Sequence, residues 1–123
     1  QQEIGDKSGE GTTLNNMATT AHARGDYETA LSYLQQSLAI RQEIGDIAGE
    51  CATQFNIAHI QYQNNKTNEA LRTWANVYET AKKIGLAQAL DALKSLAEQL
   101  ELPGGLEGWE VFLEKDITKD NKN

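Results

Sequence analysis

The amino-acid sequence predicts an all-α protein, an α-solenoid in which antiparallel helical hairpins stack on one another. Its 123 residues are rich in Ala, Leu, Gln and Glu and contain one Pro and two Phe, a composition that favours helix over sheet. The sequence also repeats itself, and within each repeat the apolar residues recur at steps of three and four. This spacing is typical of helices that bury one face.

The repeat has a period of 40 residues. Residues 2–6, QEIGD, recur as residues 42–46 (42 − 2 = 40), and the pair AL at residues 30–31 recurs at residues 70–71. A unit of this kind cannot bury its apolar face alone and stacks on its neighbours. We therefore predict a single domain over residues 1–115, consisting of repeat one at 5–44, repeat two at 45–84, and a terminal partial repeat with its cap at 85–115. Residues 116–123 have little to bury and are expected to fray.

The first helix of each repeat is expected from about Asp6 to Arg24 and from about Asp46 to Gln63. Each Asp is placed to accept the free backbone N–H groups of the first helical turn. The apolar faces of these helices are small: they consist of Leu14, Met17, Ala18 and Ala21 in the first copy, and of Ile57 and Ala58 in the second. Gln54 and Gln61 stand where apolar residues are usual, which predicts either a rotated helix or glutamines at an interface.

The second helix of each repeat carries a longer apolar stripe. The first stripe, capped by Asp26, is Tyr27, Ala30, Leu31, Leu34, Leu38 and Ile40; the second, capped by Thr67 or Asn65, is Ala70, Leu71, Trp74, Val77, Tyr78, Ala81 and Ile84. Gly25 and the Asn64-Asn65 pair are expected to separate the two helices of each repeat, because Gly and Asn tolerate positive φ. Gly85 is expected to end the last of them in the left-handed conformation.

The third copy of the first helix is more uniformly apolar, as expected beneath a terminal cap. Its apolar residues are Leu86, Ala89, Leu90, Leu93, Leu96, Ala97 and Leu100. This copy is offset by 79 residues (93 − 14), so one residue is missing near Gly85-Leu86, where a capping Asp would stand. Residues 102–105, LPGG, stop the helix, and a short helix with Leu106, Trp109, Phe112 and Leu113 on one face is expected to close the stack.

Residues 1–4 correspond to residues 41–44, the last turn of a second helix. The chain is therefore expected to start inside a repeat and either to belong to a longer array or to present an open N-terminal packing face, through which stacked repeats tend to associate. Residues 5–8, GDKS, lack the Gly-Lys-Ser order of a phosphate loop, and we interpret them as a turn between repeats.

Charge and residue usage exclude several classes of function. A net charge of −7 repels nucleic acid and anionic membrane surfaces. A single cysteine, no apolar run long enough to span a bilayer and no signal segment indicate a cytoplasmic protein. Cys51 and His59 lie eight residues apart on one helix (59 − 51), too far to form a nucleophile–base pair, and two His with one Cys are too few for a structural zinc site. We therefore expect no enzyme activity, catalytic residue, metal or cofactor.

The hairpin pattern resembles the tetratricopeptide repeat. The residues that carry the resemblance are Leu14, Met17, Ala18, Gly25, Asp26, Tyr27, Ala30, Leu31 and Leu34 in the first copy, and Ile57, Ala58, Ala70, Leu71 and Trp74 in the second. That family has a period of about 34 residues, so the longer period here is similar to the variant in kinesin-light-chain-like and bacterial arrays. The resemblance implies a right-handed superhelix whose concave wall is formed by the first helices.

Candidate binding residues lie on the exposed stripe of each first helix. They are Asn16, Thr19 and His22 in repeat one, and Asn56, His59 and Tyr62 or Gln63 in repeat two. An amide both donates and accepts hydrogen bonds and so suits an extended peptide backbone. The resemblance implies that Asn16 and Asn56 clamp a ligand main chain, a role that does not extend to Ser95 in the third copy. No Lys or Arg stands at these positions, which disfavours recognition of an acidic chain terminus.

The sequence therefore predicts a protein–protein interaction scaffold that binds a peptide or protein segment, extended and not strongly acidic, on the concave face. The alternative is a self-assembling module that forms a homo-oligomer through its open N-terminal repeat face. An enzyme is the weakest of the three interpretations.

Overall fold

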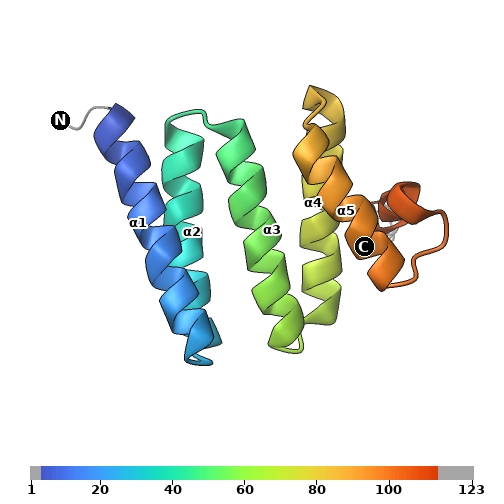
Figure 1. Ribbon diagram of the computed structural model, residues 1–123, viewed down its shortest axis with the longest axis horizontal. Coiled ribbons are helices and arrows are strands. Elements are labelled where there is room, and N and C mark those ends of the chain that lie inside the picture. The colour runs from blue at the N-terminus through green and yellow to red at the C-terminus, as the bar shows by residue number, and fades with distance from the viewer. Residues whose placement is uncertain (1–3, 114–123) are drawn as a thin grey trace, which may run out of the picture. The chain divides into compact units, whose positions relative to one another are not determined.

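The computed structural model describes residues 4–113, and this part of the chain is helical apart from short turns (Figure 1). The elements are α1 (Ile4–Ala23), α2 (Tyr27–Glu43), α3 (Ile47–Gln63), α4 (Thr67–Ile84), α5 (Ala87–Gln99) and the 3-10 helix η1 (Gly105–Trp109), followed by one helical turn over 110–113. No strand occurs within 4–113. The predicted all-α fold of consecutive helical hairpins is confirmed.

The chain divides into two compact units, residues 1–70 and residues 71–123. The first unit holds α1, α2, α3 and the first turn of α4, and the second holds the rest of α4, α5 and η1. The single domain predicted for residues 1–115 stays a prediction, and the predicted tail at 116–123 lies outside the described residues.

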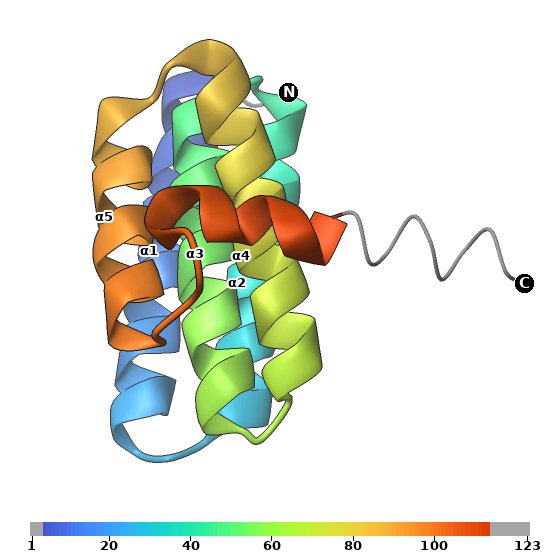
Figure 2. The ribbon, with the colours of Figure 1, turned by 90° about the vertical axis from the view of Figure 1, so that its right-hand side faces the viewer.

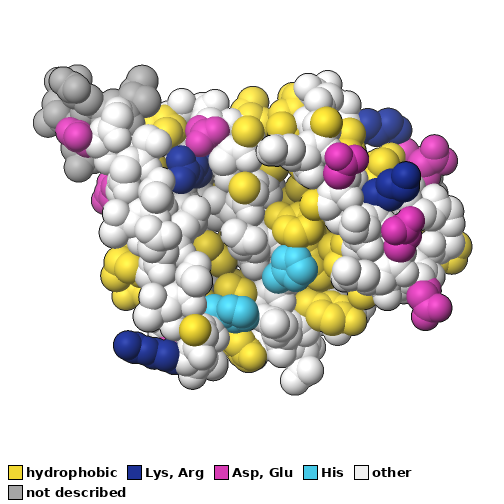
Figure 3. Space-filling view, viewed as in Figure 1, with side chains coloured by type: hydrophobic (Ala, Val, Ile, Leu, Met, Phe, Trp, Pro, Cys, Tyr) yellow, Lys and Arg dark blue, Asp and Glu magenta, His cyan; other side chains and the backbone are white. Residues whose placement is uncertain are grey.

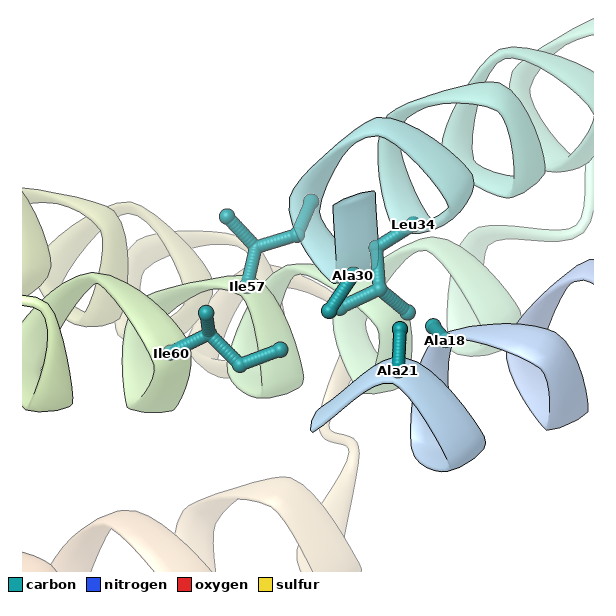
Figure 4. Packing of buried hydrophobic residues seen from close by; sticks show 6 residues of the cluster. All are labelled: Ala18, Ala21, Ala30, Leu34, Ile57 and Ile60. Carbon is teal, nitrogen blue, oxygen red and sulfur yellow. The ribbon is translucent and has the colours of Figure 1, made fainter. Parts of the chain in front are cut away.

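The core of the first unit is made of small and branched side chains. Ala18 and Ala21 of α1 and Ala30 of α2 let these helices approach closely, while Leu34 of α2 and Ile57 and Ile60 of α3 fill the remaining space. Figure 4 shows Ala30 and Leu34 pointing from α2 into the space bordered by α1 and α3. Each of the six side chains is at most 7% exposed. The stripe predicted for α2 is therefore confirmed at its centre.

Two predicted helix caps are present. The carboxylate of Asp26 accepts a hydrogen bond from the Thr29 backbone N–H at 3.2 Å, and that of Asp46 accepts one from the Gly49 N–H at 2.9 Å. These bonds satisfy donors that the first turn of a helix leaves without an intrahelical partner. Both helices begin directly after their Asp, as the sequence predicts.

The cap predicted for α4 was wrong. Thr67 is the first helical residue, and Asn65 forms the turn with a φ of 65°. The position that corresponds to Asp26 is Lys66 (26 + 40), whose carbonyl accepts a hydrogen bond from the Ala70 N–H at 3.0 Å. A lysine ammonium has no acceptor atom, so the side chain at this cap position cannot replace the aspartate.

The turn predicted at residues 5–8 was also wrong, and with it the start of the first helix. Gly5 and Asp6 lie inside α1, so Asp6 stands in the first described turn and not ahead of the helix. Gly45, the counterpart of Gly5, has a φ of 72° because the chain reverses there from α2 onto α3. The described chain makes no reversal at Gly5 and continues as helix.

A largely buried arginine links the ends of the three helices of the first unit. Arg41, near the end of α2, donates to Asp46 at 3.1 Å and to the Thr12 hydroxyl of α1 at 3.3 Å, and its side chain is 11% exposed. Gly49 lies against it: a Cβ there would stand 2.8 Å from Arg41 Cδ. The absence of a side chain at this position therefore makes room for the ion pair.

Two residues of the predicted stripes are exposed, and one polar residue is buried. Met17 is 41% exposed and Ile84 is 48% exposed. Ser37 of α2 is fully buried, and its hydroxyl donates to the Gly11 carbonyl of α1 at 3.0 Å. A hydroxyl with a partner can occupy a core position, which apolar periodicity does not detect.

The second unit is built around two tryptophans. Trp109 of η1 is fully buried, its indole N–H donates to the Leu93 carbonyl of α5 at 3.0 Å, and its ring centroid lies 5.9 Å from that of Trp74 in α4. Figure 2 shows η1 crossing α4 and α5. The predicted closing helix is thus present, as a 3-10 helix that continues into one helical turn. As the missing Asp predicts, Leu86 precedes α5 without a capping side chain.

Candidate functional site: the groove between α1 and α3

A hollow of about 300 Å³ lies within the first unit, between α1 and α3. Its floor is apolar and is formed by Ala18, Leu34 and Ile60. The lining residues that carry polar groups are Asn15, Thr19, His22, Asn56, His59 and Gln63. Figure 3 shows both histidine side chains on this face of the molecule. We call this hollow the α1–α3 groove.

Helical periodicity explains the two walls. Residues 15, 18, 19 and 22 of α1 recur at steps of three, one and three, and residues 56, 59, 60 and 63 of α3 recur at the same steps. Such residues share one face of a helix. The two sets are offset by 41 residues (56 − 15), one more than the repeat. The reason is that the groove lies between the edge of α1 that faces the following repeat, which we call forward-facing, and the edge of α3 that faces the preceding repeat, which we call backward-facing.

Five of the seven predicted binding residues line the groove, and two do not. Thr19, His22, Asn56, His59 and Gln63 are brought together, whereas Asn16 and Tyr62 are not among the lining residues. Asn16 corresponds to Asn56, which faces backward towards α1, so Asn16 faces backward as well, away from α3. By the same rule Tyr62 corresponds to His22 and faces forward.

Asn15 is the lining residue that the sequence analysis missed. The search compared equivalent positions in the two repeats, and that comparison selects Asn16 together with Asn56. The signal that identifies Asn15 is the offset of 41, because residues facing each other across a groove come from opposite edges of successive helices.

A hydrogen bond connects the two walls. His22 Nε2 of α1 lies 2.5 Å from Gln63 Oε1 of α3, and because the amide oxygen accepts, Nε2 carries the proton. The His22 ring also lies near that of Tyr27 in α2, with centroids 5.7 Å apart. His22 is thereby held by contacts with both of the other helices of the unit.

His59 lies on α3, and its ring and that of Phe55 make a T-shaped contact with centroids 4.9 Å apart. The pKa of His59 is lowered below its usual 6.5, first because the ring is partly buried and second because a charged His22 would repel a positive charge on it. Both causes disfavour the charged imidazolium. His59 is therefore a neutral hydrogen-bonding group at neutral pH.

The groove has no fixed charge. None of its lining residues within 4–113 is Asp, Glu, Lys or Arg. Among these described residues no group of three or more His, Cys, Asp and Glu side chains is placed to hold a metal ion. Burial and the nearby Glu50 raise the pKa of the Cys51 thiol, which disfavours the reactive thiolate. The groove is equipped to form hydrogen bonds and apolar contacts.

A second hollow, of about 290 Å³, lies on the opposite side of α1. It is lined by Met17, Thr20, Ala21, Arg24, Asp26, Thr29 and Tyr33. Met17 and Thr20 correspond to Ile57 and Ile60 in repeat two, which are each 5% exposed. In repeat one the equivalent surface, which we call the α1–α2 face, is accessible.

No described helix is both long and apolar enough to cross a bilayer.

Comparison with known proteins gives one finding. The sequence model of the family described as tetratricopeptide repeat matches residues 9–83, which is more than half of the chain and includes both walls of the groove. No curated protein and no solved structure matches significantly.

Proposed function

Because the chain belongs to the tetratricopeptide repeat family, we propose that it is an interaction module that binds an extended segment of another protein in the α1–α3 groove. Members of this family generally mediate protein–protein interactions and are generally non-catalytic scaffolds. We propose the same general role for this chain, in a reducing, cytoplasmic setting.

The observation that carries the proposal is the pairing of two polar walls with an apolar floor. Asn56 and Gln63 offer amides, and Thr19 offers a hydroxyl, on either side of Ala18, Leu34 and Ile60. An extended peptide presents main-chain N–H and C=O groups along its edges and directs alternate side chains downwards. The amides and the hydroxyl can form hydrogen bonds with the main-chain N–H and C=O groups, and the apolar floor can accommodate one of the side chains.

Preorganisation supports the proposal further. The three helices share one buried core, and the His22–Gln63 hydrogen bond links the walls before any ligand arrives. The ligand would then carry most of the ordering cost of association.

The test is a selection of dodecapeptides by display on the immobilised protein, followed by NMR mapping of the selected peptide on the isotope-labelled chain. We expect shifts concentrated on the two walls, and a loss of affinity of at least tenfold in an Asn56→Ala, His59→Ala double variant. Asn76→Ala, at an exposed position of α4, is the control and keeps full affinity. A peptide that binds the double variant as tightly as the wild type contradicts the proposal.

A second candidate function is self-assembly through the α1–α2 face. Met17 is 41% exposed there, and the face carries Arg24 and Asp26 together. In a two-fold symmetric pair, Arg24 of each copy could meet Asp26 of the other, since an isologous interface must complement itself.

Sedimentation at several protein concentrations tests this second candidate. A dimer that persists on dilution and is lost in Met17→Glu supports it. A chain that remains monomeric at every concentration contradicts it.

A further inference from the structure

We propose that the α1–α2 face reversibly binds an amphipathic helix of another protein, in the way that α2 packs on α3, and that Arg24 pairs with a carboxylate of that helix. This inference goes beyond the binding proposed for the α1–α3 groove, which lies on the opposite side of α1. It names a foreign helix, in place of a second copy of the chain, as the occupant of this face.

The interface between α2 and α3 provides the template. Ile57 and Ile60 of α3 are each 5% exposed. They share one buried cluster with Ala30 and Leu34 of α2. This edge of a first helix therefore accepts a helix that carries small and branched apolar side chains on one face.

The same edge is uncovered in repeat one. Met17 and Thr20 of α1 lie 40 residues before the two isoleucines of α3, and both are exposed, Met17 by 41%. They line the hollow of about 290 Å³ together with Tyr33 of α2. The hollow offers to an incoming helix the position that α2 fills in the next repeat.

Charge specifies the occupant further. At the end of the α2–α3 interface, the side-chain amide of Asn64 donates to Glu28 Oε2 of α2 at 3.1 Å. The residue that corresponds to Asn64 is Arg24 (64 − 40), which is exposed, lines the hollow and forms no ion pair with another described residue. A helix placed on α1 as α2 is placed on α3 would bring its carboxylate to this guanidinium, which is a stronger donor than an amide.

The composition of the face favours a reversible partner over a permanent one. The buried positions of α3 hold two isoleucines, whereas those of α1 hold Met17 and Thr20. Permanent interfaces resemble a protein core, and transient ones keep more polar residues. A second copy would have to offer Asp26, whose carboxylate already caps α2, whereas a foreign helix can place a free carboxylate opposite Arg24.

The chain supplies its own probe, because α2 already has the complementary face. The probe is a peptide of residues 26–43, DYETALSYLQQSLAIRQE, blocked at both ends and including the aspartate that caps the helix. A companion peptide carries Gln in place of the glutamate that corresponds to Glu28. Binding to the isotope-labelled full chain is followed by NMR titration.

Two variants of the face have matched controls in the second unit. Met17→Glu places a charge in the hollow, and Val111→Glu makes the same change in charge at a residue that is 45% exposed. Arg24→Gln removes one positive charge, and Lys94→Gln removes one from an exposed position of α5. Neither control residue lies on the α1–α2 face or in the groove.

We expect the peptide to shift resonances of Met17, Thr20 and Arg24, and Met17→Glu to weaken its binding at least tenfold. Arg24→Gln weakens it about two- to fivefold, the effect of a partly exposed ion pair, and leaves binding of the companion peptide unchanged. Both controls keep the wild-type affinity. Arg24→Glu binds the peptide still more weakly and regains affinity when the peptide carries Arg at the position of Glu28, a recovery that a purely structural effect cannot produce.

The contrary outcomes are distinct. No shift on the α1–α2 face overturns the inference, and shifts on the walls of the α1–α3 groove instead overturn it while leaving the proposed function in place. Shifts centred on Ile57 and Ile60 mean that the peptide replaces α2 in the core, and they overturn it as well. Equal losses in Arg24→Gln and Lys94→Gln overturn the pairing with Arg24. A dimer of the chain alone that is lost in Met17→Glu, measured by sedimentation, assigns the face to a second copy and overturns the foreign helix.

Discussion

The two compact units bury apolar surface in different ways. The first unit packs alanines between α1 and α2 and leaves an accessible groove between α1 and α3. The second unit places Trp74 of α4 and Trp109 of η1 together at its centre. Small core residues allow helices to pack closely, whereas each large aromatic residue buries a large apolar surface area. The difference suggests that binding is concentrated in the first unit and stability in the second.

Trp109→Ala should have the largest effect on this comparison. The substitution leaves a cavity beside Trp74 and removes the donor to the Leu93 carbonyl, so a loss of about 3–5 kcal/mol in the free energy of unfolding is expected. Chemical denaturation measures it. Trp109→Phe keeps a ring in place and should lose less. A loss below about 1 kcal/mol for the alanine variant would mean that η1 does not hold the second unit together.

Gly49→Ala should have the next largest effect, in the first unit. Alanine usually stabilises a helix relative to glycine, but a Cβ here would lie 2.7 Å from Asp46 Cγ and 2.8 Å from Arg41 Cδ. We expect a loss of about 1–3 kcal/mol as the ion pair and the cap are displaced.

Gly9→Ala is the matched control for this substitution. Gly9 corresponds to Gly49 (9 + 40), lies within α1 and would have no atom within 4 Å of an added Cβ. It should gain about 0.5–1 kcal/mol. If both alanine variants are stabilised, the junction around Arg41 is not closely packed.

Lys66→Asp should stabilise the protein by supplying the cap that the sequence lacks. Asp26 and Asp46 occupy the corresponding positions of α2 and α3 and accept backbone N–H groups. An aspartate at position 66 should do the same for α4, with a gain of about 1 kcal/mol. Thermal unfolding measures it, and Lys66→Ala separates capping from loss of the lysine. A rise in Tm that is no larger for Asp than for Ala would argue against a cap at this position.

Repetition made most of the fold predictable. Residue type within the repeat placed the turns at Gly25, Asn65 and Gly85, where the structure has positive φ, and the helix caps Asp26 and Asp46. The errors occurred where one copy departs from the other. Lys66 replaces the capping Asp, and Gly5 is helical although its counterpart Gly45 turns, because the described chain does not reverse at Gly5.

The groove was predictable only in part, for a geometric reason. Comparing equivalent positions identifies residues that face the same way in each repeat, such as Asn16 and Asn56. A groove between two helices needs residues that face one another, and these differ by one position in register. The unpaired oxygen of Asn15 and the His22–Gln63 bond depend on side-chain packing, which periodicity does not describe.

Acidification should produce the smallest of these effects, and it would sharpen the comparison because it acts on the groove of the first unit. The folded-state pKa of His59 lies below its usual 6.5, so the unfolded chain binds more protons than the native chain once the pH falls below about 6.5. The free energy of unfolding should therefore decrease from about pH 6.5 downwards and level off below the folded-state pKa, whereas above about pH 7.5 His59 contributes no pH dependence.

Urea denaturation of wild type and His59→Gln at pH 7.5 and 5.5 measures this contribution. The wild type should lose more stability than the variant between the two values, because glutamine keeps a neutral polar side chain at the rim and cannot take up a proton. Equal losses would mean that the His59 imidazole is as well hydrated in the folded protein as in the unfolded chain. The groove wall of α3 would then be more open to water than the contact between His59 and Phe55 indicates.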